Sequence, residues 1–330
     1  MPIDRKRIDE LLERTRDVRI AVVGDCMLDI YLTGTVGRIS PEAPVPVVHV
    51  SQERWAPGGA ANVAGAVTAL GAECELVGVV GLDSASRQLV DALARLGVAG
   101  DRLVTVPERQ TTTKTRIMAR HQHVVRFDRE TDADVSEDVA RRLLENVEEV
   151  ADSVDAIILQ DYNKGALVPA VIQGTIEIAQ RGAIPAVADP KFARFFEYSG
   201  VHLFKPNAHE LAAALGTPSA PREPDGLRAA SERIGCQFLL LTLAEEGMIL
   251  YGRDDSFHHI HAVARDVFDV SGAGDIVTAT VAVCLAAGGT EIEAAMVANY
   301  AAGVEVSKSG VVPVRPDEIL AALDEHSETA

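Results

Sequence analysis

Seven residues near the C-terminal end of the chain, DVSGAGD at 269–275, set small residues and an acid directly before an apolar run, IVTATVAVCLAA. Gly272 and Gly274 permit a tight turn that leaves backbone N–H groups free where a helix begins, and such groups bind anions. Asp275 in that place would repel anions, but it can take a proton from a hydroxyl that attacks a phosphoryl group. The stretch therefore predicts a phosphoryl-transfer site. The alternative is a glycine-rich turn with Asp275 as a first-turn acid that the helix dipole favours.

A second glycine-rich stretch, PGGAANVAGA at 57–66, also leads into a helical pattern. Its glycines let a ligand approach the backbone closely, and Asn62 can donate to and accept from hydroxyl groups. Asp25 and Asp29 flank the end of the first predicted strand, and ligands of parallel sheets bind beyond the carboxyl ends of the strands. These residues are candidates for holding sugar hydroxyls. An ordinary helix start and strand end would explain them as well.

The charge of the chain reverses locally. The formal net charge is −18, which argues against nucleic acid or an anionic membrane as a partner. Window 109–129 nevertheless holds six basic residues and one acid, a balance of six minus one, or +5. Strand periodicity places Lys114 and Arg116 on one face. The window predicts an anionic ligand such as a phosphorylated substrate, and a solvated edge strand guarded by charge is the alternative.

The stretch KPNAHE at 205–210 places Asn207 and Glu210 one helical turn apart. A helix capping pair explains this spacing, and a water-mediated hold on magnesium is the functional alternative. The sequence has no GxxxxGK[ST] phosphate loop, no GxGxxG after the first strand and no GxSxG elbow. A P-loop enzyme is therefore excluded, and a dinucleotide oxidoreductase has little support.

The elements that must position these residues follow an alternating pattern. Short apolar strands, beginning with 19–25, alternate with helical segments, which predicts an α/β fold with a mostly parallel sheet and helices on both faces. Two β-rich inserts, at about 31–50 and 111–127, interrupt the alternation and predict a small β lid beside the main sheet. We expect residues 1–330 to form a single domain with this lid.

Composition bears on the compartment. The four cysteines are widely spaced without a CxxC pair, which suits a reducing environment. The charged N-terminal stretch lacks an apolar signal core, and the run at 276–287 is too short to span a bilayer. These features predict a cytoplasmic protein that does not bind membranes.

Taken together, PGGAAN and DVSGAGD resemble the two signature motifs of the PfkB/ribokinase carbohydrate kinase family, in the expected order. The resemblance covers nearly the whole chain and implies a ribokinase-like fold. Four further stretches are similar to the heptose 7-phosphate kinases of this family: RISPEAPVPVV, TKTRIMARHQHVVRFD, DYNKGAL and ADPK. The resemblance implies ATP- and Mg-dependent phosphorylation of the anomeric hydroxyl of D-glycero-β-D-manno-heptose 7-phosphate, in ADP-heptose and lipopolysaccharide core biosynthesis.

The resemblance also implies roles for individual residues. Asp275 corresponds to the catalytic base, and the anion hole to the N–H groups of Gly272, Ala273 and Gly274. Sugar-hydroxyl contacts correspond to Asp29, Gly58, Gly59 and Asn62. The resemblance implies that the nucleotide and its magnesium are bound by Asn207, Glu210, Thr242, Gly247 and Asn299. It implies that Glu210 holds the magnesium through water. The resemblance implies that the substrate and its 7-phosphate are bound by Lys114, Arg116, Gln122 and Arg126, with Lys164 and Lys191 as further candidates.

Two positions depart from the family pattern. Val270-Ser271 stands where a threonine is usual, although Ser271 keeps a hydroxyl, and Asn163 stands where a small residue is expected. The resemblance further implies a homodimer formed through the lid, and it leaves a monovalent-cation requirement open. Competing interpretations are a kinase of the same family that acts on fructose phosphate, ribose or a nucleoside, a non-catalytic sugar-phosphate sensor, and a Rossmann oxidoreductase.

Overall fold

The computed structural model describes residues 4–119, 122–263, 267–308, 310 and 312–327. Its main sheet has nine strands in the order β13-β12-β11-β10-β9-β8-β1-β4-β5. All neighbours from β11 to β5 are parallel, and β12 and β13 add an antiparallel edge. The predicted α/β fold with a mostly parallel sheet is thus confirmed. The strands are β1 (Arg19–Gly24), β4 (Glu73–Gly81), β5 (Leu103–Val106), β8 (Ala156–Gln160), β9 (Ala186–Asp189), β10 (Leu203–Phe204), β11 (Phe238–Thr242), β12 (Met248–Gly252) and β13 (Phe257–Ile260).

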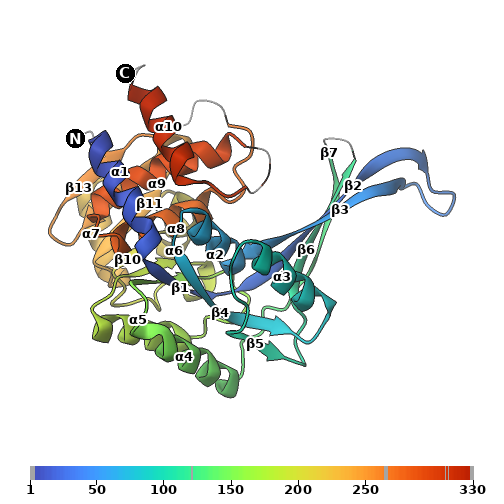
Figure 1. The fold of residues 1–330 in the computed structure, drawn as a ribbon, viewed down its shortest axis with the longest axis horizontal. Coiled ribbons are helices and arrows are strands. Elements are labelled where there is room, and N and C mark those ends of the chain that lie inside the picture. Colours follow the sequence, from blue (N-terminus) through green and yellow to red (C-terminus); the bar gives the residue numbers. More distant parts are fainter. Residues whose placement is uncertain (1–3, 120–121, 264–266, 309, 311, 328–330) are drawn as a thin grey trace.

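Helices cover both faces of this sheet (Figure 1). Successive residues of β1 point to opposite faces, so Ile20 joins one apolar cluster and Ala21 the other. One cluster is covered by α1 (Arg5–Arg14), α2 (Ala60–Ala69), α3 (Ser84–Arg95), α8 (Ala273–Ala286), α9 (Glu291–Val306) and α10 (Pro316–Ser327). The other is covered by α4 (Glu137–Ala151), α5 (Pro169–Gly182), α6 (Ala208–Leu215) and α7 (Pro224–Ile234). Burial on both faces explains why the strand sequences read as continuous apolar runs.

A second, four-stranded sheet projects from the main body (Figure 1), and we call it the small sheet. Its strand order is β3-β2-β6-β7, with β2 and β6 parallel and the outer pairs antiparallel. The two β-rich inserts fall within it, although its strands are longer than the sequence suggested. These strands are β2 (Cys26–Ile39), β3 (Pro46–Gly59), β6 (Thr112–Ala119) and β7 (Gln122–Arg129).

Three elements did not emerge from the sequence: α1, β5 and α7. Helix α1 is mostly charged, and only Ile8, Leu11 and Leu12 are buried, at helical spacing. Strand β5 has four residues, too few for a clear period. The helix expected from residue 58 begins at Ala60, because Gly58 and Gly59 still pair with Met27 and Cys26 in the small sheet. In the described part of the chain, every helix is too short or too polar to cross a membrane.

Asp25 ties the end of β1 to the loop that follows β8. Its buried carboxylate accepts hydrogen bonds from the backbone N–H groups of Tyr162 (2.8 Å), Lys164 (2.9 Å) and Ala166 (3.0 Å). Within this loop Asn163 has a φ of 54°, a conformation that asparagine tolerates better than most residues. The loop geometry therefore explains the asparagine at a position where a small residue is usual.

Replacing Asp25 by alanine should lower the free energy of unfolding by about 2–4 kcal/mol, because three buried N–H groups lose their acceptor. Urea denaturation monitored by circular dichroism measures this difference. Asp91→Ala, at an exposed position of α3, is the matched control and should change stability by less than about 0.5 kcal/mol. Similar losses in both variants would contradict a structural role for the Asp25 carboxylate.

Candidate active site

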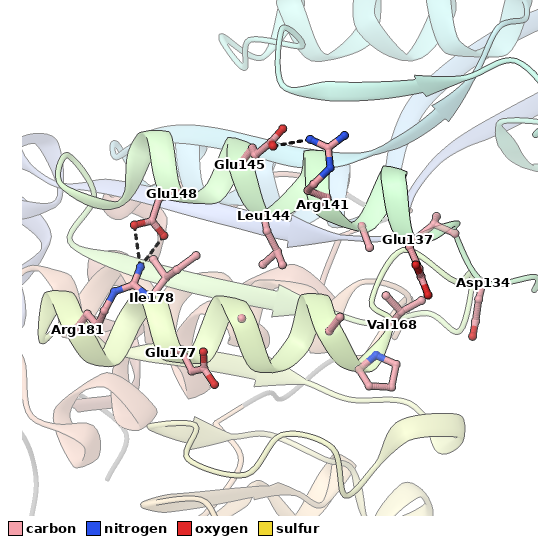
Figure 2. Close-up of a pocket in the computed structure, with 15 residues that line it drawn as sticks. Asp134, Glu137, Arg141, Leu144, Glu145, Glu148, Val168, Glu177, Ile178 and Arg181 are labelled. Carbon is pink, nitrogen blue, oxygen red and sulfur yellow. Dashed lines mark hydrogen bonds and ion pairs between the residues drawn. The ribbon is translucent and has the colours of Figure 1, made fainter.

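The structure contains two large cavities. One, of about 790 Å³, is a groove between α4 and α5 that is lined by Leu144 of α4 and Ile178 of α5 (Figure 2). Its rim carries ion pairs between Arg141 and Glu145 and between Arg181 and Glu148. None of the predicted site residues lines this groove. The other cavity, of about 760 Å³, lies at the carboxyl ends of the strands and contains the N-terminus of α8. We call it the cleft.

The N-terminus of α8 forms one wall of the cleft. Gly272 is the residue before the helix and has a φ of 92°, which glycine adopts without strain. The first intrahelical bond runs from the N–H of Ile276 to the carbonyl of Gly272 (3.0 Å), so the N–H groups of Gly274 and Asp275 precede the helical ladder. The N–H of Ala273 instead donates to the Val270 carbonyl over 3.4 Å. The helix start thus offers an anion cradle to the cleft.

Asp275 is buried at this helix start and is held from three sides. One carboxylate oxygen accepts from the Asn62 amide (2.7 Å), and the other accepts from the Tyr162 hydroxyl (2.7 Å) and the Gln160 amide (3.2 Å). Burial raises the pKa of Asp275 to about 6, while the hydrogen bonds from Asn62 and Tyr162 oppose this rise. The carboxylate is therefore ionised at neutral pH and more basic than an exposed aspartate.

Two lysines bring positive charge to the same wall. The ammonium group of Lys205, which is 3% exposed, lies 3.1 Å from Asp189 and 3.6 Å from the position a Cβ would take at Gly274. Lys191 pairs with Glu210 and also lies over the ring of Tyr162, with its nitrogen 5.4 Å from the ring centroid. The cleft therefore carries cations beside free N–H groups, an arrangement that suits the phosphates of a nucleotide.

Asn207 and Glu210 form the capping box of α6. The Asn207 side chain accepts from the N–H of Glu210 (2.8 Å), and the Glu210 carboxylate accepts from the N–H of Asn207 (2.9 Å). Both residues nevertheless line the cleft, together with the carboxylate of Asp189. The structural and the functional interpretation of this pair are thus compatible, because the cap holds Glu210 at the edge of the cavity.

The far end of the cleft is mostly apolar. Thr242, Gly247 and Asn299 line it, among side chains that include Val263 and Val306. Gly247 has a φ of 95°, and a Cβ there would lie 2.0 Å from the carbonyl oxygen of Ile260. The Asn299 amide donates to the His261 carbonyl (2.7 Å), which holds the chain after β13 beside the cavity. Such a slot can take a flat apolar ring system.

The predicted sugar contacts lie where the small sheet meets the main sheet. Asp29 is 8% exposed and accepts a 2.6 Å hydrogen bond from Arg116. A Cβ at Gly58 would lie 2.8 Å from an Asp29 carboxylate oxygen, so glycine is required for this close approach. Gly59 precedes α2, which carries Asn62 to Asp275. The structure thus brings the first signature stretch to the acid of the second.

Other predicted residues lie away from the cleft. Lys164 pairs with Asp132 (2.7 Å) and Glu130 (3.1 Å) instead of lining it. On the small sheet, Lys114 lies 4.0 Å from Glu130, Arg126 pairs with Asp128 (2.7 Å), and Gln122 is exposed at the start of β7. Three of the six basic residues of window 109–129 are thus paired with acids, namely Lys114, Arg116 and Arg126.

Four residues of the site were missed from the sequence: Gln160, Tyr162, Asp189 and Lys205. Gln160 and Asp189 end the parallel strands β8 and β9, Lys205 directly follows β10, and Tyr162 is the second residue after β8. The sequence does contain a signal for these residues, because polar residues at the carboxyl ends of buried parallel strands face the side of the sheet where ligands bind. The stretches DYNKGAL and KPNAHE contain Tyr162 and Lys205, but neither stretch by itself assigns these two residues to the site.

The sheet order, the glycine-led helix start and the buried acid define a phosphoryl-transfer enzyme of the ribokinase-like class. The fold is similar to Arabidopsis thaliana ribokinase complexed with ribose and ATP (TM-score 0.72, 20% identity, 93% of this chain and 98% of that chain). It is also similar to Escherichia coli phosphofructokinase-2 in complex with fructose-6-phosphate (TM-score 0.75, 20% identity, 94% and 99%). Residues 17–318 match the model of the pfkB family carbohydrate kinases, and the chain belongs to that family.

Relatives share more of the sequence. The chain is 46% identical over 325 residues to the bifunctional protein HldE of Pelobacter propionicus, covering 97% of this chain and 66% of the relative. It is 45% identical over 321 residues to the bifunctional protein HldE of Azorhizobium caulinodans, covering 95% and 66%. The chain therefore spans about two thirds of the length of these relatives.

Glu305 on α9 is a second buried acid near the cleft. It is 3% exposed, and one of its carboxylate oxygens has no hydrogen-bond partner among the described residues. Burial raises its pKa to about 8, and the charges of Asp275 and Asp269 add to this effect. At neutral pH the folded chain therefore keeps a proton on Glu305 that the unfolded chain releases.

Glu305→Gln should become more stable relative to the original protein as pH rises. The folded pKa lies above the unfolded value, so this group destabilises the original protein between about pH 4.5 and 8, by up to about 1.4 kcal/mol per pH unit. Urea unfolding of both proteins across this range measures the difference. Glu232→Gln, at an exposed position of α7, is the control and should show no such trend. A pH-independent difference for Glu305→Gln would contradict the assignment.

Proposed function

We propose that the chain transfers the γ-phosphoryl group of ATP to the anomeric hydroxyl of D-glycero-β-D-manno-heptose 7-phosphate. The product would be the 1,7-bisphosphate, a precursor of ADP-heptose for the lipopolysaccharide core. The observation that carries the chemistry is the buried Asp275, which joins the helix start of α8 to Asn62 from the first signature stretch. Support for the substrate comes from the heptose-kinase-like stretches of the sequence and from the relatives named HldE.

In this mechanism the two substrates approach Asp275 from opposite sides. The adenine of ATP occupies the apolar end of the cleft near Asn299, and the triphosphate runs toward the N–H groups of α8 and the ammonium groups of Lys191 and Lys205. The sugar lies on the side of Asp29 and Asn62. Asp275 accepts the proton of the attacking hydroxyl, and the N–H groups and lysines stabilise the charge on the transferring and leaving phosphates.

Magnesium fits the same cleft, because Asp189, Asn207 and Glu210 present the oxygen donors that this ion prefers. Among the described residues no cluster of three or more His, Cys, Asp or Glu side chains could hold a metal. The ion would therefore be held mainly by the phosphates and by water, with Glu210 ordering that water. When bound, it would neutralise the phosphate oxygens and align them for in-line transfer.

The protein should convert heptose 7-phosphate and ATP to a sugar 1,7-bisphosphate and ADP, which ³¹P NMR detects directly. Asp275→Asn should lower kcat by about 10²–10⁴-fold, because the base is lost while the shape is kept. In the unmodified enzyme, activity should fall about tenfold per pH unit below pH 6, as Asp275 becomes protonated. Asp91→Asn, on exposed α3, controls for general effects of the substitution.

Other outcomes of this assay decide between the alternatives. Preferred turnover of fructose phosphate, ribose or a nucleoside would assign a different substrate within the family. Binding of sugar phosphate without ATP consumption would indicate a sensor. Near-normal turnover by Asp275→Asn would refute the assignment of the base.

We also propose that the chain is a cytoplasmic homodimer formed through the small sheet. The face of this sheet that includes Ile30 and Leu32 is apolar, and strand register continues it through Ile117 to Val125 and Phe127. At its outer end Val125 is 48% exposed and Phe127 42% exposed. An apolar sheet face at the tip of a projecting element is suited to pairing with a second copy. ATP and a sugar phosphate are both cytoplasmic metabolites, which supports the compartment.

Phe127→Lys should convert the dimer to a monomer, because the pairing face would carry an unpaired charge. Sedimentation equilibrium or light scattering after gel filtration measures the mass. Phe257→Lys is the matched control, since Phe257 is exposed to a similar extent (37%) on β13 of the main sheet. A mass unchanged by Phe127→Lys, or shifted equally by both variants, would refute this interface.

A further inference from the structure

The face of the small sheet opposite the apolar one carries four basic side chains against two acidic ones: Arg54, Lys114, Arg116 and Arg126 against Asp29 and Asp128. Residues paired across strands share a face. The register places Arg54 and Arg116 beside Tyr31, and Arg126 beside Arg116. Asp29 lies on this same face, two residues before Tyr31 on β2. The basic face therefore begins at the predicted sugar contact and continues outward from it.

Arg54 differs from the other basic residues of this face. Lys114, Arg116 and Arg126 each have a carboxylate within 4.0 Å. Across the described ranges of the chain, Arg54 forms neither an ion pair nor a side-chain hydrogen bond, and its contact is with an aromatic ring. Its guanidinium carbon lies 4.8 Å from the centroid of Tyr31, and that of Arg116 lies 5.2 Å from the same centroid. Two guanidinium groups thus flank the Tyr31 ring, and Asp29 balances the positive charge of Arg116 only.

The cluster faces the main body near the start of α8. The negative charge of Asp269, three residues before Gly272, acts on the Tyr31 hydroxyl, and an Arg54 nitrogen lies 3.9 Å from the Cβ position at Gly310. The Tyr31 hydroxyl donates no hydrogen bond to any described residue. Burial raises the pKa of Tyr31 above its ordinary value, so the phenol stays protonated and available as a donor. The cluster is thus an unfilled set of N–H and O–H donors beside the sugar side of the site.

We propose that Arg54 is a substrate-binding residue that, with Arg116 and the Tyr31 hydroxyl, holds the phosphate ester of the phosphorylated sugar. This inference rests on the proposed function. Positions two residues apart on one strand face are separated by about 7 Å. A sugar whose hydroxyls contact Asp29 can therefore place a phosphate on its far carbon beside Tyr31. The guanidinium fork binds phosphate in two-point geometry, and Arg116 has donors beyond the one given to Asp29.

The test compares Arg54→Gln, Arg54→Lys and Arg38→Gln in steady-state kinetics with heptose 7-phosphate and ATP. Arg54→Gln should raise the KM for the sugar phosphate about 10- to 100-fold and leave the KM for ATP within twofold, because a charged donor to phosphate is lost. Arg54→Lys should recover part of this loss. Arg38 is exposed near the end of β2, the strand of the small sheet that carries Tyr31, and Arg38→Gln should behave as the original protein. Tyr31→Phe should raise the same KM several-fold.

The possible failures are distinguishable. If the original protein phosphorylates no sugar phosphate, the proposed function fails and this inference fails with it. If the original protein is active but Arg54→Gln keeps its KM for the sugar phosphate, only the role of Arg54 is overturned. Equal rises in both KM values, or a matching effect of Arg38→Gln, would also overturn it, because they indicate a general disturbance of the small sheet. Calorimetric titration of heptose 7-phosphate into each variant should show the same ranking as the KM values.

Discussion

The site depends on the burial of one carboxylate. Asp275 reaches its raised pKa because water is excluded around it, and it remains an acceptor because Asn62, Gln160 and Tyr162 donate to it. These donors come from α2, from the end of β8 and from the loop after it. A buried charge requires such partners, since leaving it unpaired costs several kcal/mol. The packing of α2 and of the end of β8 around α8 therefore fixes the position of this carboxylate.

Charge is distributed unevenly around this carboxylate. Beside the start of α8 lie Lys191, which is paired with Glu210 of α6, and Lys205, which is paired with Asp189 of β9. The face of the small sheet carries arginines around Tyr31, and most of these are also paired. Positive charge therefore lies on both sides of the carboxylate, and most of it is balanced by neighbouring acids. Arg54 is the exception among the cations named here, because no carboxylate of the described residues pairs with it.

The sequence predicted the fold class and the two signature stretches because both depend on local patterns. Apolar runs buried on both faces indicate parallel strands, and glycines before apolar segments indicate helix starts. Local patterns could not predict that Gln160, Tyr162, Asp189 and Lys205 lie together around Asp275. Their proximity depends on the order of strands in the sheet, in which β8, β9 and β10 are neighbours. The basic window shows the same limit, since Glu130 and Asp29 lie outside it and pair with its residues Lys114 and Arg116 in space. Roles of individual residues in binding and catalysis remain predictions.

Asp25 connects the small sheet to the main sheet. It is the single residue between β1 and β2, and its carbonyl accepts from the N–H of Ala60 (3.0 Å), where the chain returns from β3 to α2. Its carboxylate meanwhile fixes the loop that carries Tyr162. Both ends of the long β2–β3 hairpin are thus held at Asp25. One residue at the root of the small sheet is thereby connected to Tyr162 and, through the start of α2, to Asn62, which are two of the three residues that hold the Asp275 carboxylate.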